Sequence, residues 1–298
     1  MRRLESGISI DNESFSDIAR YENETISKTT IINSNVRSPI FWSCHLDHLV
    51  FDTCDLTNAR FFAGSTIDHC TFSRSDLRSV GIGKNEAVFT NCVFSSCDMR
   101  GMTLENATFI DCTFSKCRFN DRVLQAANIV NCTFGGKLID ITFEGNGKQK
   151  LIADFENCTL DGVRFTGCDL SACIPPASKN HLYIEKVSAR VKKALKMIDD
   201  DPALSDDERK ILVRSLRKLE HMEQYIFNTK HMGLLLLSDF SVILNAARIT
   251  LNVCCIPPTL SLCGISVSSI FERDEFFDFH LDQLPIHLND DKTCWSEV

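Results

Sequence analysis

Cysteine is the residue type whose number and spacing in this chain first suggest chemistry. The chain has 15 cysteines in 298 residues, and Cys92, Cys97, Cys112 and Cys117 are all separated by multiples of five. Regularly spaced cysteines commonly bind zinc or form disulfides. A zinc site needs close CxxC-type pairs and converging ligands, and this stretch of sequence has neither. The spacing therefore requires a structural explanation.

A second group of reactive side chains lies near the end of the sequence. His280, His287 and Cys294 are close together, and a Cys–His pair can supply a nucleophile and its base. No recognisable catalytic motif surrounds them. The acidic runs at 199–201 and 206–208 flank expected helix ends, where such residues act as solvated caps rather than metal ligands. We therefore expect no catalytic residue, no cofactor-binding residue, no metal site and no enzymatic activity.

Composition excludes several classes of protein. The net charge of -8 and the pI near 5.5 argue against a nucleic-acid binder, which would carry a basic face. The first thirty residues are polar and contain no apolar stretch typical of a classical signal peptide. The most apolar segment, GLLLLSDFSVILNAARITLNVCC, is interrupted by Asp239 and Arg248, so we expect no membrane span.

The first half of the chain is an internal repeat with a period of five residues. Each repeat is centred on a large apolar residue, with slips of register near residues 62 and 83 and a longer insertion between 134 and 155. The expected centres are Ile31, Val36, Phe41, Leu46, Phe51, Leu56, Phe61, Ile67, Phe72, Leu77, Ile82, Phe89, Phe94, Met99, Leu104, Phe109, Phe114, Phe119, Leu124, Ile129, Phe134, Phe143, Phe155, Leu160, Phe165 and Leu170.

A second inward position lies two residues before each centre. It is mostly Cys, Ala, Ser, Thr or Val. Two inward positions per five residues fit neither the helical period of 3.6 nor the strand period of 2, but they fit a coil that turns a corner every five residues. One large and one small side chain on each side would fill a narrow core. The expected structural core includes Phe89, Phe94, Phe109, Phe114, Phe119, Phe134, Cys92, Cys97, Cys112, Cys117 and Cys132.

Segments such as CDLTNARF (54–61), CTFSRSDL (70–77) and CDMRGMTLENATF (97–109) resemble the pentapeptide-repeat family. The resemblance implies a mainly β solenoid: a right-handed, four-sided β-helix with four pentapeptides per coil, over residues 29–174. Residues twenty apart would then stack, so that Phe94 lies on Phe114. The chain departs from the common pattern by preferring Cys at the small position and Phe at the centre.

The repeat gives the cysteines a structural role. Ten of them lie two residues before a centre, and Cys173 continues the same spacing. We interpret all eleven as small, soft core residues that are reduced and metal-free, as expected in a cytosol.

Three regions follow from this interpretation. We expect a flexible polar N-terminus over 1–28, the β-helix over 29–174 and a helical region over 175–298. The helical region would contain a helical hairpin over about 179–229 that caps the solenoid, an apolar helix over about 234–253 and a mixed tail. The Gly- and Lys-rich insertion EGNGKQK (144–150) would be a surface loop.

Three classes of function remain open. We favour a non-catalytic protein–protein interaction scaffold, similar to bacterial pentapeptide-repeat effectors that act in the host cytosol after non-classical secretion from the bacterial cytoplasm. Its partner would be a protein, not a nucleic acid, and the sequence fixes no oligomeric state. One alternative is a truncated or divergent HECT-like effector ubiquitin ligase. The other is a DNA mimic that binds topoisomerase, for which the mixed charge of residues 1–174 is poorly suited.

Overall fold

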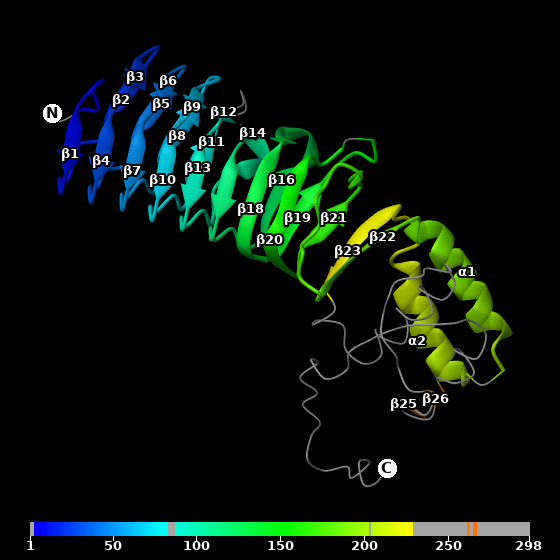
Figure 1. Cartoon of the computed structure of the whole chain (residues 1–298). Coiled ribbons are helices and arrows are strands. Elements are labelled where there is room, and N and C mark those ends of the chain that lie inside the picture. Colours follow the sequence, from blue (N-terminus) through cyan, green and yellow to red (C-terminus); the bar gives the residue numbers. More distant parts are fainter. Residues whose placement is uncertain are drawn as a thin grey trace, which may run out of the picture. The chain divides into compact units, whose positions relative to one another are not determined.

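The computed structural model describes residues 3–82, 87–148, 150–202, 204–228, 261–262 and 265–266. The chain divides into two units, and the first contains residues 1–187 and 222–231. This unit is a parallel β-solenoid of about eight coils, one for each strand of its longest sheet. Figure 1 shows the coils stacked in sequence order from β1 to β21. The four-sided β-helix expected from the repeat is confirmed.

Each coil has four sides, and equivalent sides of successive coils pair in parallel. The first side is an eight-stranded sheet of β1 (Ser9–Asp11), β4 (Thr30–Ile32), β7 (Val50–Asp52), β10 (Thr71–Ser73), β13 (Val93–Ser95), β15 (Thr113–Ser115), β18 (Cys132–Ile139) and β20 (Ala153–Asp161). The second side is a ladder of single-residue bridges through Ser14, Asn35, Asp55, Asp76, Asp98 and Arg118.

The third side contains two sheets. The first consists of β2 (Arg20–Glu22), β5 (Ile40–Trp42), β8 (Arg60–Phe62) and β11 (Gly81–Ile82). Further along the chain lie η1 (Leu104–Asn106), β16 (Arg122–Gln125), β19 (Ile141–Glu144) and β21 (Arg164–Thr166). The fourth side is a six-stranded sheet of β3 (Thr25–Ser27), β6 (His45–Asp47), β9 (Thr66–Asp68), β12 (Ala87–Thr90), β14 (Ala107–Ile110) and β17 (Ile129–Val130).

All of the expected centres are buried, with exposed fractions of 4% or less. On the first side the centres from Phe51 to Phe155 form a continuous stack of phenylalanine rings, because the parallel register places each ring on its equivalent in the next coil. Neighbouring ring centroids in this stack are 4.9–5.3 Å apart, and the rings are close to parallel. The spacing matches the ~4.8 Å separation of paired strands, so the backbone register itself sets the aromatic packing.

The small inward positions also satisfy backbone groups at the corners. Cys112 is representative, because its thiol lies 3.3 Å from the carbonyl oxygen of Ile110 and 3.4 Å from that of Phe89 in the preceding coil. Ser75 uses its hydroxyl in the same way toward Ser73 and Phe51. A small side chain with one weak donor therefore fills the gap and pairs a buried carbonyl at the same time. This second role explains why Cys and Ser recur here.

One small position differs from the expected register. Before Ile129 the buried residue is Ala126, whereas Ala127, two residues before the centre, is exposed. The cause is η2 (Ala126–Asn128), a 3-10 turn that replaces the extended backbone at this point. Because such a turn advances the chain less per residue than a strand does, the inward position moves back by one.

The corner residue two positions after most centres has a left-handed backbone conformation. Examples are Asn33 (φ 49°), Asn58 (φ 60°) and Asn131 (φ 53°). Asn and Asp tolerate this region better than other side chains, and Gly tolerates it best. The corner geometry therefore accounts for the many asparagines of the repeat.

Two glycines on successive coils are in close contact, and this gives a sharp test of the coil packing. A Cβ added at Gly167, where φ is +62°, would lie 2.5 Å from the carbonyl oxygen of Gly145. Gly167→Ala should therefore destabilise the solenoid by more than the ~1 kcal/mol that a left-handed alanine costs. Gly64→Ala is the matched control, since φ is +73° there and nothing lies within 4 Å of the added atom. Urea unfolding of both variants measures the difference, and equal effects would refute the contact.

The expected flexible N-terminus over 1–28 is wrong. Residues 9–11, 20–22 and 25–27 form the strands of the first coils, and Ile10, Phe15, Tyr21 and Ile26 are buried centres. Leu4 covers the end of the core and donates its backbone N–H to the Tyr21 hydroxyl at 2.7 Å. The polar residues of this segment occupy outward positions of folded coils, so their composition resembles that of an unfolded segment.

The expected helical cap over 179–229 is also wrong in part. Strands β22 (His181–Glu185) and β23 (Gln224–Asn228) form an antiparallel ribbon that contacts the last coil. The backbone N–H of Leu160 donates to Nε2 of His181 at 3.0 Å, and that of Leu170 donates to Oε1 of Gln224 at 2.5 Å. Ile226 joins the solenoid core. Side chains of a β-ribbon therefore cap backbone groups of the last coil, which sequence periodicity alone did not indicate.

The second unit contains the two expected helices, α1 (Val187–Asp200) and α2 (Asp206–Arg217), except that Val187 itself is assigned to the first unit. Arg209 on α2 donates hydrogen bonds to the carbonyl oxygens of Ile198 and Asp201. A short pair, β25 (Ser261–Leu262) and β26 (Ile265–Ser266), is antiparallel. Within the described part of the chain, no helix is both long and apolar enough to cross a membrane. The expected apolar helix over 234–253 lies outside the described residues.

Candidate functional site

The cysteines of the repeat are buried in positions unsuited to reaction chemistry. All five of the expected core cysteines and all six expected core phenylalanines are buried. The eleven repeat cysteines are free thiols, and only Cys168 and Cys173 are half-buried. Burial raises the pKa of Cys158, Cys168 and Cys173 to about 12, so these thiols are protonated at neutral pH. Since the thiolate is the reactive form, these three cysteines are poorly reactive at neutral pH. The other eight repeat cysteines are buried, so all eleven contribute to the packing of the core.

The outer surface of the third side carries a patch that we call the aromatic strip: Ile40, Trp42 and Phe62, with Arg20 and Arg60 beside them. These residues come from β2, β5 and β8, where they are the outward neighbours of the buried centres. Trp42 is 43% exposed. Its ring meets that of Phe62 edge to face at 6.0 Å, and the Arg20 guanidinium lies 5.8 Å from its centroid. The strip thus presents a large apolar surface held in a fixed orientation.

Two arginines hold the edges of the aromatic strip. Arg20 forms an ion pair with Glu22 at 2.6 Å. Arg60 donates from Nη1 to the carbonyl oxygens of Asn58, Ala59 and Ser79 at 2.8–3.0 Å. None of these residues was expected from the sequence to form a site. The strand stretches IFW and RFF contain the signal, since residues on both sides of a buried centre must point outward.

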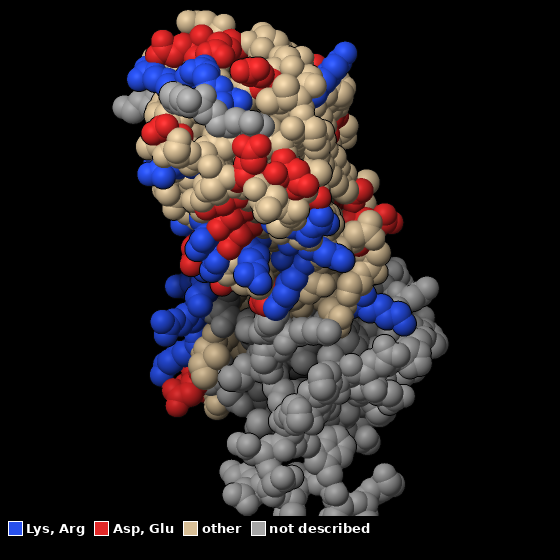
Figure 2. All heavy atoms as spheres, turned by 90° about the vertical axis from the view of Figure 1, so that its left-hand side faces the viewer, with Lys and Arg blue, Asp and Glu red and all other residues tan. Residues whose placement is uncertain are grey.

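On the second side, acidic side chains form ion pairs with arginines of the same coil. Arg78 contacts both carboxylate oxygens of Asp76, and Arg100 does the same with Asp98 in the next coil. Hydrogen bonding to Arg100 holds the pKa of Asp98 below its usual range. Figure 2, which views the N-terminal end of the solenoid, also shows Lys and Arg beside Asp and Glu on that face. In both places acidic side chains lie beside basic ones.

The other sites suggested by the sequence are less informative. In the 144–150 insertion, Asn146, Gly147, Lys148 and Lys150 are exposed, as expected of a surface loop. Its start is tied to the next coil, because Gly147 donates its N–H to the carbonyl oxygen of Gly167 at 2.7 Å. His280, His287 and Cys294 lie outside the described residues.

Comparison with protein-family models identifies the repeat. Residues 85–124 match a model described as pentapeptide repeats in nine copies, and residues 153–174 match one described as pentapeptide repeats in eight copies. These segments are pentapeptide repeats. The resemblance to pentapeptide repeats, and the solenoid that it implied, are therefore confirmed. No curated protein matches the chain.

Solved structures similar to this chain share little sequence with it. A trypsin-treated variant of QnrB1, a plasmid-mediated fluoroquinolone resistance protein, has 15% identity and a TM-score of 0.29, over 54% of this chain and 91% of that one. A second treated QnrB1 variant has 16% identity and a TM-score of 0.26, over 57% and 78%. HetL, a pentapeptide repeat protein involved in heterocyst differentiation regulation from the cyanobacterium Nostoc sp., has 13% identity and a TM-score of 0.17, over 57% and 87%.

Proposed function

We propose that this protein is a non-catalytic scaffold that binds a protein partner on the aromatic strip. The observation that carries the proposal is the exposed Trp42, which lies between Phe62 and Arg20 on a rigid sheet. Trp, Tyr and Arg are the residue types most enriched among the energetically dominant residues of protein interfaces. The expected partner presents an apolar side chain that packs against the Trp42 and Phe62 rings.

Rigidity supports this assignment. The strip lies on strands whose inward neighbours, Tyr21, Phe41 and Phe61, are stacked at centroid distances of 5.0 and 5.2 Å. The backbone of the strip is therefore held by a packed core, and little backbone entropy remains to be lost when a partner binds. Solenoids commonly use such repeated outer surfaces for binding.

Replacing Trp42 by Ala should weaken binding of the partner at least about tenfold, because interface tryptophans contribute roughly 2 kcal/mol or more. The side chain points outward, so the stability of the solenoid should change little. Affinity capture with the full-length protein, followed by titration of the captured partner, measures the effect.

Val93→Ala is the matched control. Val93 is 39% exposed and lies on β13, on the first side of the solenoid. A partner that binds wild type and Val93→Ala but is lost from Trp42→Ala supports the proposal. Equal loss in both variants, or unchanged binding in both, rejects it.

For the setting of this interaction, we propose a bacterial effector acting in a host cell. The solenoid architecture supports this setting, because it displays repeated outward-facing side chains on a packed core. A translocation reporter fused to the chain tests it: signal in infected host cells is expected, and signal confined to the bacterium contradicts it.

The competing functions make distinct biochemical claims. A HECT-like ligase would form a reductant-sensitive ubiquitin adduct when mixed with charged conjugating enzyme, and we expect none. An adduct lost in Cys294→Ala would reject the non-catalytic proposal. A DNA mimic would inhibit topoisomerase supercoiling, and inhibition that survived Trp42→Ala would favour that alternative.

A further inference from the structure

The dipeptide Asp–His occurs twice on the fourth side, at the same corner of successive coils. Asp47 pairs in register with Asp68 between β6 and β9, so the two histidines that follow, His48 and His69, also lie one above the other. Both histidines have left-handed backbone conformations, with φ of 52° and 48°. The coil repeat thus brings together two pairs of like side chains, and the members of each pair are 21 residues apart in the sequence.

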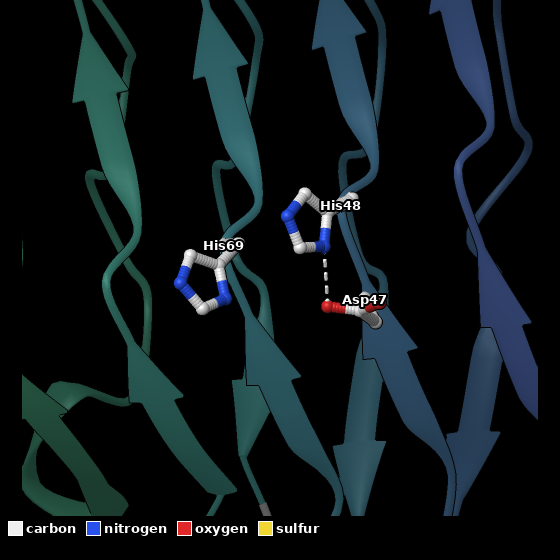
Figure 3. A group of neighbouring side chains, drawn as sticks. All are labelled: Asp47, His48 and His69. Atoms are coloured by element: carbon white, nitrogen blue, oxygen red, sulfur yellow. Dashed lines mark hydrogen bonds and ion pairs between the residues drawn. The ribbon is translucent and has the colours of Figure 1, made fainter.

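The side chains at this corner converge, as Figure 3 shows for three of them. Nδ1 of His48 lies 2.6 Å from Oδ1 of Asp47, and Nδ1 of His69 lies 3.1 Å from Oδ1 of Asp68. The two imidazole rings stack at 4.7 Å between centroids. One potential ligand atom each from Asp47, His48 and His69 falls within 4.8 Å of the others.

Asp68 supplies a second and independent observation. Its side chain is 33% exposed, but its Oδ1 atom is buried and has only the 3.1 Å ion-pair contact with Nδ1 of His69, without a well-aligned hydrogen bond. A buried carboxylate oxygen with so weak a partner is unfavourable, and the equivalent carboxylate of Asp47 is on the adjacent strand. A cation at the corner would offset the negative charge of both side chains.

The donor set favours a particular class of cation. Imidazole nitrogen with carboxylate oxygen suits zinc and neighbouring first-row divalent metals, whereas calcium and magnesium prefer oxygen ligands. Ligand atoms around tetrahedral zinc lie ~2.0–2.2 Å from the metal, so the side chains must draw closer and the stacked rings must turn. This is feasible because the His48 and His69 side chains are 56% and 47% exposed.

We propose that Asp47, His48 and His69 form a binding site for a first-row divalent transition metal, with Asp68 as an additional carboxylate beside it. The metal replaces the proton that Asp47 and His48 share and bonds to Nδ1 of both imidazoles, which leaves each Nε2–H toward solvent. Because its ligands come from two successive coils, the bound metal joins these coils across the corner. Lys28 and Asn91 occupy the same corner in the flanking coils, so the stack of histidines at this corner ends at His48 and His69.

A Co²⁺ titration of the full-length, tag-free protein tests the site. Visible absorption without thiolate-to-cobalt charge transfer reports ligation by nitrogen and oxygen, which separates this site from cysteine sites. We expect wild type to bind one more equivalent of Co²⁺ in this mode than the double variant His48→Asn/His69→Asn. Asn suits the corner, because Asn91 has the same left-handed conformation one coil further on.

His45→Asn is the matched control, since His45 is exposed in the same coil but its Nδ1 contacts Thr66 Oγ1 at 2.7 Å. This variant should bind Co²⁺ as wild type does. Zn²⁺ should displace the metal, and binding should weaken on acidification because protons compete for the imidazoles. The same number of nitrogen- and oxygen-bound equivalents in wild type and the double variant would overturn the proposal. Displacement by millimolar Ca²⁺ as readily as by Zn²⁺ would do so too.

Discussion

Replacing Phe114 by Ala should lower the free energy of unfolding by about 3–5 kcal/mol. The ring is 1% exposed and lies between Phe94 and Phe134, each 5.0 Å away between centroids. It also meets Phe109 edge to face at 5.1 Å. The surrounding coils are fixed by their strand ladders and cannot collapse into the space, so the variant retains a cavity. Urea unfolding with a constant m-value measures the loss.

Phe94→Ala combined with Phe114→Ala provides a stricter test of the stack. Because the two rings contact each other directly, the double variant should differ from the sum of the single effects by roughly 0.5–1.5 kcal/mol. Val93→Ala, on the outer surface of the same sheet, should change stability by less than about 0.5 kcal/mol. A small effect for Phe114→Ala would contradict the inward stack.

Replacing Cys112 by Asp should destabilise the solenoid severely, by about 4 kcal/mol or more, whereas Cys112→Ala should be mild. The side chain is 1% exposed and its thiol contacts only carbonyl oxygens and neighbouring core groups. An aspartate there would have no cationic partner in the core, and burial of an unpaired charge is among the few changes with effects this large.

The effect of Cys112→Asp should depend on pH. Burial raises the pKa of a carboxyl group above its value in the unfolded chain, so the folded variant binds more protons than the unfolded one between the two pKa values. Its stability should therefore be highest at acidic pH and fall as the pH rises, when compared with Cys112→Ala under the same conditions. Denaturant midpoints of both variants at several pH values measure this, and a pH-independent difference would place the side chain in solvent.

The inward-facing side chains of the solenoid were predictable from the sequence, because burial requires a particular residue type at a fixed spacing. Each centre needs a large apolar side chain, and each small position needs one that fits between coils. The repeat was expected to begin only at Ile31, although Tyr21 and Ile26 continue the spacing of five backwards. The residues two positions before these centres are Ala19 and Glu24 rather than Cys, and the segment is rich in polar residues. The repeat was therefore not recognised there.

The outward features were harder to predict because no packing rule constrains them. The aromatic strip needs the strand register that places Trp42 beside Phe62, and the Asp–His corner needs the 21-residue offset between its pairs. The β-ribbon depends on pairing between segments about 40 residues apart, separated by two helices. Local periodicity does not report such long-range pairing, and the hairpin expected over about 179–229 therefore included residues 181–185, which form β22.

Site-specific photo-crosslinking tests the proposed binding surface most directly. A photoreactive residue replaces Ile40, beside Trp42 on β5, in one full-length protein and Val93 on β13 in another, so that Trp42 itself is kept. We expect a discrete covalent adduct with one protein from position 40 and none from position 93. Adducts of equal yield from both positions, or an adduct from position 93 alone, would contradict the proposal.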